Sequence, residues 1–359
     1  MASADAGGGA DSAVPESSAT RCGSTDPDRC ADSGSMADVD ADAGRGGAVS
    51  DGHTESGSLA TSIAIGANDG SGWGASPATT IVRGHITWER VEIGGDVTVA
   101  DSIGNGFQVL AIVNNPDDCT PLGQIDPATW AEGVVSQIKA NPGMRFAEAG
   151  NEMYLKGTTG NGCAGSTQYA DPQHYGAMYL AAIQAMSTAG VAMPLLFNMT
   201  GDYNTAKGWS QDANGGGWLR DAVNANPGLG AAILANGVTT HPYGGIGQNT
   251  DGDSSGTGAV AAQEAVAKTV LGGIPAFYIT EFGFDLSRCG TPSGACSQAD
   301  QANEMQEAYD VFLADPHVKG IWWYQSHDDS SGSWGFMNND NSTRPSFDTL
   351  SAIAKSQGQ

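Results

Sequence analysis

Two glutamates stand directly after short apolar runs of the sequence, where a buried strand would end. Glu152 closes the segment Ala147-Glu-Ala-Gly-Asn-Glu, and Glu281 follows the run 276–280. A charge at the end of an apolar strand costs free energy unless the protein uses it. Two carboxyl groups on either side of an acetal bond can share its cleavage, because one protonates the leaving oxygen while the other attacks or stabilises the anomeric carbon.

Further polar and aromatic residues lie at the same kind of position. They are Asn151, Arg83 at the end of the run 79–83, His241 and Tyr243 after the run 237–240, Trp323 in the run 320–324, and Trp334 in a later loop. Arg83 and the Tyr243 hydroxyl could hold Glu281 ionised, and the charge of one carboxylate favours protonation of a carboxyl group beside it. Flat aromatic faces suit sugar stacking, which makes Trp323 and Trp334 candidates for substrate binding.

Each of these assignments has an alternative. Arg83 could instead pair with Glu148, which shares the inward face of the fourth run. His241 could support another residue rather than contact a substrate. The alternation of side chains along a strand leaves Trp322 open in place of Trp323.

The elements that would position these residues are short apolar runs separated by helical patterns. The runs cover residues 61–66, 79–83, 107–113, 144–147, 194–197, 237–240, 276–280 and 320–324. Asp126-Pro127 and Asp171-Pro172 each offer a helix cap followed by proline at the first helical position. Helical patterns also cover residues 260–271, 304–313 and a closing segment around Leu350, whereas only residues 96–105 remain for a helix after the second run.

Eight strands alternating with helices predict an α/β protein with a (β/α)8 TIM barrel over residues 59–359. Residues 1–58 consist mostly of small and polar residues, so we expect a disordered, low-complexity segment or tail before the barrel. The fourth and seventh strands lie on opposite sides of such a barrel. Glu152 and Glu281 would therefore face each other across its mouth, where the carboxyl ends of the strands meet.

The order of these motifs resembles clan A of the glycoside hydrolases, which includes families 5 and 39. The resemblance rests on Gly150-Asn151-Glu152 and Thr280-Glu281-Phe282-Gly283, with His241-Pro-Tyr243 between them and Trp323-Tyr324 after them. It implies a retaining glycosidase in which Glu152 is the general acid/base and Glu281 the nucleophile. In these roles Glu281 must be ionised, held so by Arg83 and Tyr243, and Glu152 must start protonated. Asn151 would bind the sugar 2-hydroxyl.

The resemblance also favours an endo-acting enzyme on a β-linked polysaccharide such as a glucan or mannan. The alternatives are an exo-acting β-glycosidase and a non-catalytic carbohydrate-binding barrel. A metal-dependent barrel hydrolase would need several ligands at strand ends, where only His85 and His241 are candidates. We therefore expect neither a metal nor a cofactor.

Charge and cysteine content bear on partners and location. The net charge is −25, from 40 acidic and 15 basic residues, which disfavours nucleic acid and anionic membranes as partners. Six cysteines without a CxxC pair favour three disulfides, Cys22–Cys30, Cys119–Cys163 and Cys289–Cys296, although unpaired buried thiols are the alternative. The N-terminus lacks the apolar stretch of a signal peptide. Together with the cysteines, this predicts a secreted protein whose signal has been removed, acting as a monomer on an oligo- or polysaccharide.

Overall fold

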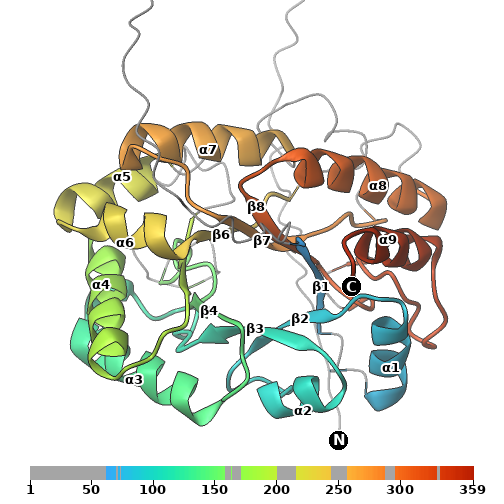
Figure 1. The fold of residues 1–359 in the computed structure, drawn as a ribbon, viewed down its shortest axis with the longest axis horizontal. Helices are drawn as coiled ribbons and strands as arrows, with labels where there is room; N and C mark the ends of the chain where they lie inside the picture. Colours follow the sequence, from blue (N-terminus) through green and yellow to red (C-terminus); the bar gives the residue numbers. More distant parts are fainter. Residues whose placement is uncertain are drawn as a thin grey trace, which may run out of the picture. The chain divides into compact units, whose positions relative to one another are not determined.

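The computed structural model contains a closed barrel of eight parallel strands, which follow one another around the barrel in sequence order (Figure 1). It describes residues 62–69, 72, 74–157, 163, 171–199, 216–243, 257–287, 296–329 and 332–359. The strands are β1 (Ala64–Asn68), β2 (Trp88–Glu92), β3 (Gln108–Val113), β4 (Phe146–Ala149), β5 (Leu195–Asn198), β6 (Val238–Thr240), β7 (Phe277–Phe282) and β8 (Val318–Trp323). The predicted (β/α)8 barrel is therefore confirmed.

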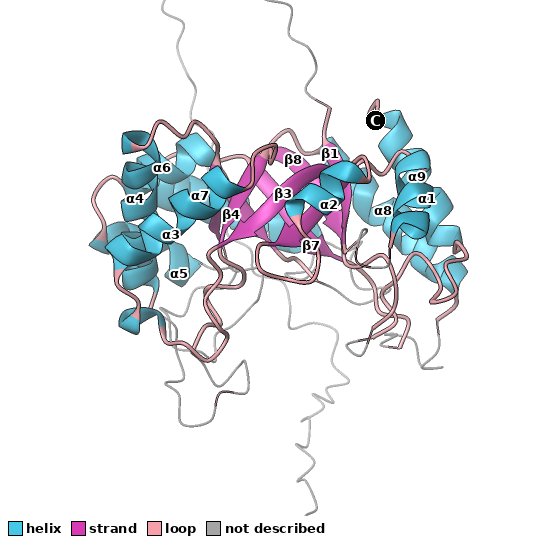
Figure 2. Ribbon diagram, turned by 90° about the horizontal axis from the view of Figure 1, so that it is seen from below, coloured by secondary structure: helices cyan, strands magenta, loops and turns pink. Residues whose placement is uncertain are grey.

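Helices surround the barrel on its outside, as the end-on and side views show (Figures 1 and 2). They are α1 (Ala75–Arg83), α2 (Val99–Gly104), α3 (Pro127–Ala140), α4 (Pro172–Thr188), α5 (Gly216–Ala225), α6 (Leu229–Asn236), α7 (Thr257–Leu271), α8 (Gln298–Ala314) and α9 (Pro345–Ser356), with a short 3-10 helix, η1 (Leu122–Gln124), before α3. The predicted starts of α3 and α4 are confirmed. Asp126 and Asp171 accept hydrogen bonds from the backbone N–H groups of Thr129 and His174, and proline occupies the first position of each helix.

One predicted strand is wrong, because residues 79–83 form the end of helix α1. Their β-branched composition suggested a strand, but the hydroxyls of Thr79 and Thr80 donate to the carbonyls of Ala75 and Ser76, one helical turn earlier. The second strand is β2 instead, whose sequence Trp-Glu-Arg-Val-Glu carries three charges. His85, expected on the same strand, precedes β2, and its Nδ1 lies 2.6 Å from the carbonyl oxygen of Gln359.

Several strand boundaries also differ from the prediction. Strand β7 reaches Phe282, so Glu281 lies within the strand rather than after it. Strand β4 ends at Ala149, which places Glu152 three residues beyond it in the loop that follows. Two helices, α5 and α6, stand between β5 and β6, where the alternating pattern requires only one.

The interior of the barrel has an apolar layer and a polar layer. The apolar layer contains Ala64, Leu110, Leu196, Tyr278 and Trp322, against which Trp88 and Phe146 pack. Further along the strands, toward their carboxyl ends, buried polar side chains follow: Asn68, Arg90, Glu148, Asn198, Thr239 and Thr280. Hydrogen bonds link these side chains directly, for example from Asn198 Nδ2 to Thr239 Oγ1 at 2.8 Å. The polar layer forms the floor on which the candidate site is built.

A disulfide joins Cys119, in the loop after β3, to Cys163, in the loop after β4, as predicted. Cys296 is also disulfide-bonded, and its predicted partner Cys289 lies outside the described residues. The Cys22–Cys30 pair and the expected tail 1–58 lie outside them as well. Within the described ranges, no helix combines the length and apolar character that crossing a membrane requires.

Candidate active site

Glu281 projects from β7 and is held by two short hydrogen bonds. Arg90 Nη1 donates to its Oε1 and the Tyr243 hydroxyl donates to its Oε2, each at 2.6 Å. Burial, followed by the negative charge of Glu281, raises the pKa of Tyr243 well above its ordinary value, so this hydroxyl keeps its proton and remains a donor. Only 8% of Glu281 is exposed. The carboxylate is therefore fixed in position by two donors of different chemistry.

Arg90, and not Arg83, is the cation of this site. Arg83 is exposed at the end of α1, because the segment predicted as the second strand is helical. The guanidinium of Arg90 donates to Glu148 Oε2 at 2.7 Å, to Glu281, and to Asn151 Oδ1 at 2.6 Å. Burial lowers the pKa of Arg90, but the two carboxylates outweigh this effect and raise it, so Arg90 stays charged.

Glu152 reaches the site from a strained turn. Its φ is 45°, in the left-handed region, which is unusual for a residue other than glycine and clusters at functional sites. Gly150, two residues earlier, has φ 74°, and a Cβ there would lie 2.4 Å from Met153 Sδ. These two conformations turn the chain sharply after β4. The turn brings Glu152 back over the barrel mouth, where 30% of its side chain is exposed.

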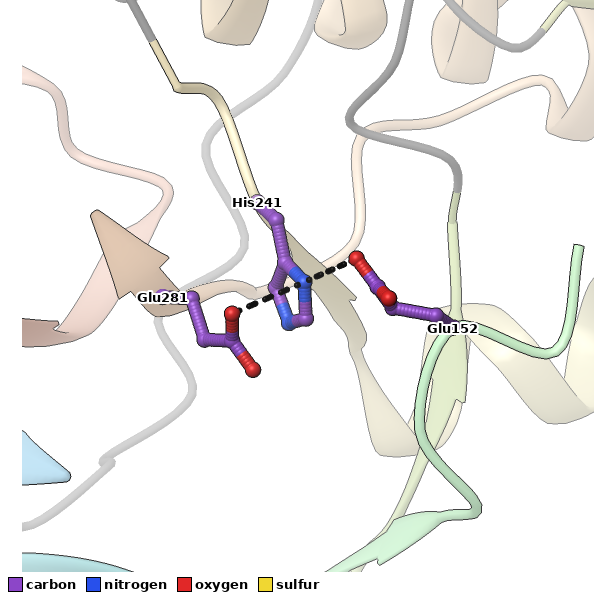
Figure 3. A group of neighbouring side chains, drawn as sticks. All are labelled: Glu152, His241 and Glu281. Atoms are coloured by element: carbon purple, nitrogen blue, oxygen red, sulfur yellow. Dashed lines mark hydrogen bonds and ion pairs between the residues drawn. The ribbon is translucent and has the colours of Figure 1, made fainter. Parts of the chain in front are cut away.

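His241 lies between the two glutamates (Figure 3). Its Nδ1 is 3.3 Å from Glu152 Oε1 and 3.6 Å from Glu281 Oε2. One carboxylate oxygen of each glutamate and one ring nitrogen of His241 lie within 4.8 Å of one another. Paired carboxyl groups about 5–5.5 Å apart are typical of retaining glycosidases, whereas inverting enzymes separate them by about 6.5–9.5 Å to admit a water molecule.

The pKa directions of Glu152 and His241 run against the expectation that Glu152 starts protonated. Burial raises the pKa of Glu152, but the hydrogen bond and charge of His241 outweigh burial, and the net pKa lies below the ordinary value. Burial lowers the pKa of His241, while the charge of Glu281 and the hydrogen bond to Glu152 raise it to a net value above the ordinary one. Both directions favour a proton on His241 beside an ionised Glu152.

The predicted aromatic contact at the end of β8 is also wrong. Trp323 is fully buried on the outer face of the sheet, where its ring packs against Phe282 and Phe284. Its indole N–H donates to the carbonyl of Trp334. Trp322 is fully buried on the inside, in the apolar layer. Alternation along the strand sends one tryptophan to each side of the sheet and leaves neither at the mouth.

Tyr324, the next residue, lies at the mouth instead. It is half-buried, and its ring centroid is 5.9 Å from that of Tyr243 and 5.8 Å from that of Trp334. Trp334 is half-buried as well and lies 5.4 Å from Tyr243. These three rings form an aromatic wall beside Glu281. Counting strand β8 to its end at Trp323 would have pointed to Tyr324.

The site thus combines predicted and unpredicted residues. The structure brings together Glu152, Glu281, Asn151, His241, Tyr243 and Trp334, and it adds Arg90, Tyr324, Asn68 and Thr280. Asn68 accepts from Arg90 Nη1 at 3.1 Å and donates to the carbonyl of Thr280, which ties β1, β2 and β7 together. A strand signal that could have identified Arg90 is present in the sequence. Apolar and β-branched residues lie on either side of Glu89-Arg90 in the segment Ile86-Thr-Trp-Glu-Arg-Val-Glu-Ile93.

In two places within the described ranges, three side chains bring one potential metal-ligating atom each close together. Glu152, His241 and Glu281 form one such group, but the Arg90 guanidinium already neutralises Glu281 there and would repel a cation. Glu264, Asp315 and His317 form the other, at the opposite end of the barrel where β8 begins. Burial, followed by the charge of Asp315, raises the pKa of Glu264 to about 7.

The same architecture occurs in solved structures of sugar-cleaving enzymes. A family 39 glycoside hydrolase from Bacteroides cellulosilyticus WH2 superposes with a TM-score of 0.55 at 15% identity, over 81% of this chain and 63% of that one. A xylanase from Cellvibrio japonicus superposes with a TM-score of 0.53 at 15% identity, over 81% of this chain and 97% of that one. For fungal β-1,4-galactanases the TM-score is 0.54 at 10% identity, over 77% of this chain and 90% of the other. The chain has the fold of these enzymes.

This chain spans only 63% of the length of the family 39 protein. No protein-family model matches the sequence, and no curated protein matches it. The likeness therefore concerns the fold, and the activity has to be argued from the site.

Proposed function

We propose that the protein is a retaining glycoside hydrolase in which Glu281 is the nucleophile and Glu152 the general acid/base. The observation that carries the proposal is that an oxygen of one carboxyl group lies within 4.8 Å of an oxygen of the other at the barrel mouth. One comes from β7 and the other from the turn after β4. At that separation a carboxylate reaches the anomeric carbon directly, and a water molecule does not fit between carboxylate and sugar.

The two steps follow from the contacts of each glutamate. In the first, a Glu281 oxygen forms a bond to the anomeric carbon while the bond from that carbon to the leaving oxygen breaks, and Glu152 protonates the leaving oxygen. In the second, Glu152 takes a proton from water, the water oxygen bonds to the anomeric carbon, and Glu281 leaves as a carboxylate. Arg90 and Tyr243 stabilise that carboxylate in the free enzyme and hold its attacking oxygen in place.

Asn151 is positioned to bind the sugar next to the bond that is cleaved. Its Oδ1 accepts from Arg90 Nη2 at 2.6 Å, and its backbone N–H donates to Asn115 Oδ1 at 2.9 Å. With Oδ1 engaged, the side-chain amide presents its NH₂ group to the mouth, where it can donate to a sugar 2-hydroxyl. The aromatic wall of Tyr243, Tyr324 and Trp334 supplies flat faces for the ring of the same sugar.

For the substrate we propose a β-linked polysaccharide such as a glucan or mannan, cleaved within the chain. The structural neighbours include xylanases and β-1,4-galactanases, which supports a polysaccharide. The Cys119–Cys163 disulfide supports an oxidising location outside the cell. A net charge of −25 suits a neutral sugar polymer better than an anionic one.

A product screen with matched variants tests the proposal. The protein is incubated with β-glucans, mannans, xylans and galactans, and the products are resolved by size. Internal cleavage gives a ladder of oligosaccharides, whereas an exo-acting enzyme releases one small product. Glu281→Ala should abolish turnover and leave sugar binding largely intact. Wild-type turnover in that variant would refute the nucleophile assignment, and binding without hydrolysis in the wild type would indicate a carbohydrate-binding barrel.

A further inference from the structure

The hydroxyl of Thr280 lies between a buried carboxylate and His241. Its Oγ1 donates to Glu148 Oε1 at 3.3 Å and lies 3.1 Å from His241 Nε2. Glu148 is fully buried in the polar layer of the barrel and also accepts from Arg90 and Asn198. An irregularity in the pairing of β7 with β8, between Ile279 and Phe282, allows consecutive residues 280 and 281 both to reach the site.

These contacts decide which nitrogen of His241 carries a permanent proton. A hydroxyl has one hydrogen to donate, and Thr280 gives it to Glu148, because a carboxylate can only accept. The contact between Thr280 Oγ1 and His241 Nε2 then requires the nitrogen to be the donor. Nε2 is therefore protonated in both charge states of the ring, and Nδ1 is the atom that gains and loses a proton.

Nδ1 faces both glutamates of the site. The charged and titratable groups around the ring are Glu152 from the turn after β4, Glu281 from β7, Arg90 from β2, and Tyr243 from its own segment. Tyr243 and Arg90 both donate to Glu281 at 2.6 Å, so Glu281 is already satisfied by closer donors. The nearer carboxylate oxygen to Nδ1 is Glu152 Oε1, at 3.3 Å.

We propose that Glu148 and Thr280 are positioning residues that fix the tautomer of His241, so that its Nδ1 stores the proton Glu152 delivers to the leaving group. This inference rests on the proposed function for its purpose, but the tautomer itself can be observed without a substrate. The directions of the two pKa shifts agree with it, because they favour a charged His241 beside an ionised Glu152.

The proton balance over one cycle is closed. At the start of the cycle His241 is an imidazolium and Glu152 a carboxylate. The Nδ1 proton moves to Glu152 Oε1, which leaves a neutral imidazole with its proton on Nε2, and Glu152 then protonates the leaving oxygen. In the second step Glu152 removes a proton from the attacking water. That proton returns to Nδ1, and no other donor or acceptor is needed.

Nitrogen NMR of the full chain labelled with ¹⁵N-histidine tests the tautomer directly. His241→Asn identifies the resonances of His241. At a pH where the ring is neutral, we expect the wild type to carry its proton on Nε2. Thr280→Val removes the hydroxyl and should shift the population toward Nδ1–H, whereas Thr280→Ser keeps the hydroxyl and should resemble the wild type. A neutral wild-type ring protonated on Nδ1 would overturn the proposal, as would a Thr280→Val spectrum identical to the wild type.

Kinetics then test the link to Glu152. On an aryl glycoside whose leaving group needs protonation, we expect Thr280→Val to lower kcat/KM by about 10–100-fold. The loss should be much smaller on an aryl glycoside with an acidic leaving group, and Thr280→Ser should restore most of the activity. An equal loss on both substrates would overturn the proton-storage role. The NMR result does not depend on turnover. If the protein proves not to be a glycosidase, the tautomer of His241 can still be determined, so the two proposals can fail separately.

Discussion

Arg90 and Glu281 form a buried ion pair, with Arg90 Nη1 2.6 Å from Glu281 Oε1. The same guanidinium reaches Glu148 through Nε at 2.7 Å, so one cation from β2 joins carboxylates from β4 and β7. Only 4% of the Arg90 side chain is exposed. The relationship fixes the proposed nucleophile to two other strands of the barrel.

Replacing Arg90 should damage both activity and stability. Arg90→Met leaves two buried carboxylates without their partner, which costs about 3–5 kcal/mol of unfolding free energy. It also frees Glu281, so we expect kcat/KM to fall by about 10²–10³-fold. Arg83→Met is the matched control, because Arg83 is exposed at the end of α1, and it should change stability by less than about 0.5 kcal/mol. Urea unfolding and steady-state kinetics on both variants decide whether Arg90 or Arg83 serves the site.

Gly150→Ala should reduce activity through the backbone of Glu152. Both Gly150 and Gly190 have left-handed φ angles, 74° and 67°, so alanine at either position costs about 1–2 kcal/mol. At Gly190 nothing lies within 4 Å of the added Cβ, whereas at Gly150 it meets Met153 Sδ and disturbs the turn that carries Glu152. We expect both variants to lower the melting temperature, Gly150→Ala more because of the contact with Met153, and only Gly150→Ala to lower kcat. Equal kcat values would show that the turn does not position Glu152.

The cluster of Glu264, Asp315 and His317, near the start of β8, predicts that the stability of the fold depends on pH. The pKa of Glu264 is raised from 4.5 to about 7 in the folded protein. Between these values the folded state holds a proton that the unfolded state has released, so this group's contribution to stability falls as the pH rises. Glu264→Gln should therefore stabilise the protein more at about pH 8 than at about pH 5. The exposed Glu307→Gln controls for the loss of one charge, and a gain that does not change with pH would contradict the assignment.

Tyr324→Ala should weaken sugar binding by removing one ring of the aromatic wall. The ring is half-buried and packs against Tyr243 and Trp334. Its loss therefore also removes about 0.5–1.5 kcal/mol of ring–ring interaction from the folded protein, in addition to the buried area. Binding is measured on the inactive Glu281→Ala background, which separates affinity from turnover. If the affinity for the oligosaccharide products stays at the parental value, Tyr324 does not contact the sugar.

The sequence predicted most of the fold, because eight apolar runs and two Asp-Pro helix starts are local signals. It failed at the second strand, where charged Glu89 and Arg90 are buried by partners far away in the chain, and a helix of β-branched residues resembled a strand. The two glutamates could be identified as candidates from their pairing and from the order of the motifs around them, since a single carboxylate at a strand end is a weak signal. Trp323 was misassigned, because the alternation of β8 can be counted only once its end is known. The roles of Glu148 and Thr280 depend on contacts between strands, which no single segment reveals.

The stereochemistry of cleavage tests the central claim most directly. Once a hydrolysed glycoside has been found in the substrate panel, proton NMR can follow the anomeric configuration of the first product formed, before it mutarotates. Two carboxyl groups with oxygens within 4.8 Å of each other, one group acting as nucleophile, predict that the product keeps the configuration of the substrate. A first product with inverted configuration would contradict the account, because it would require a water molecule between Glu281 and the sugar.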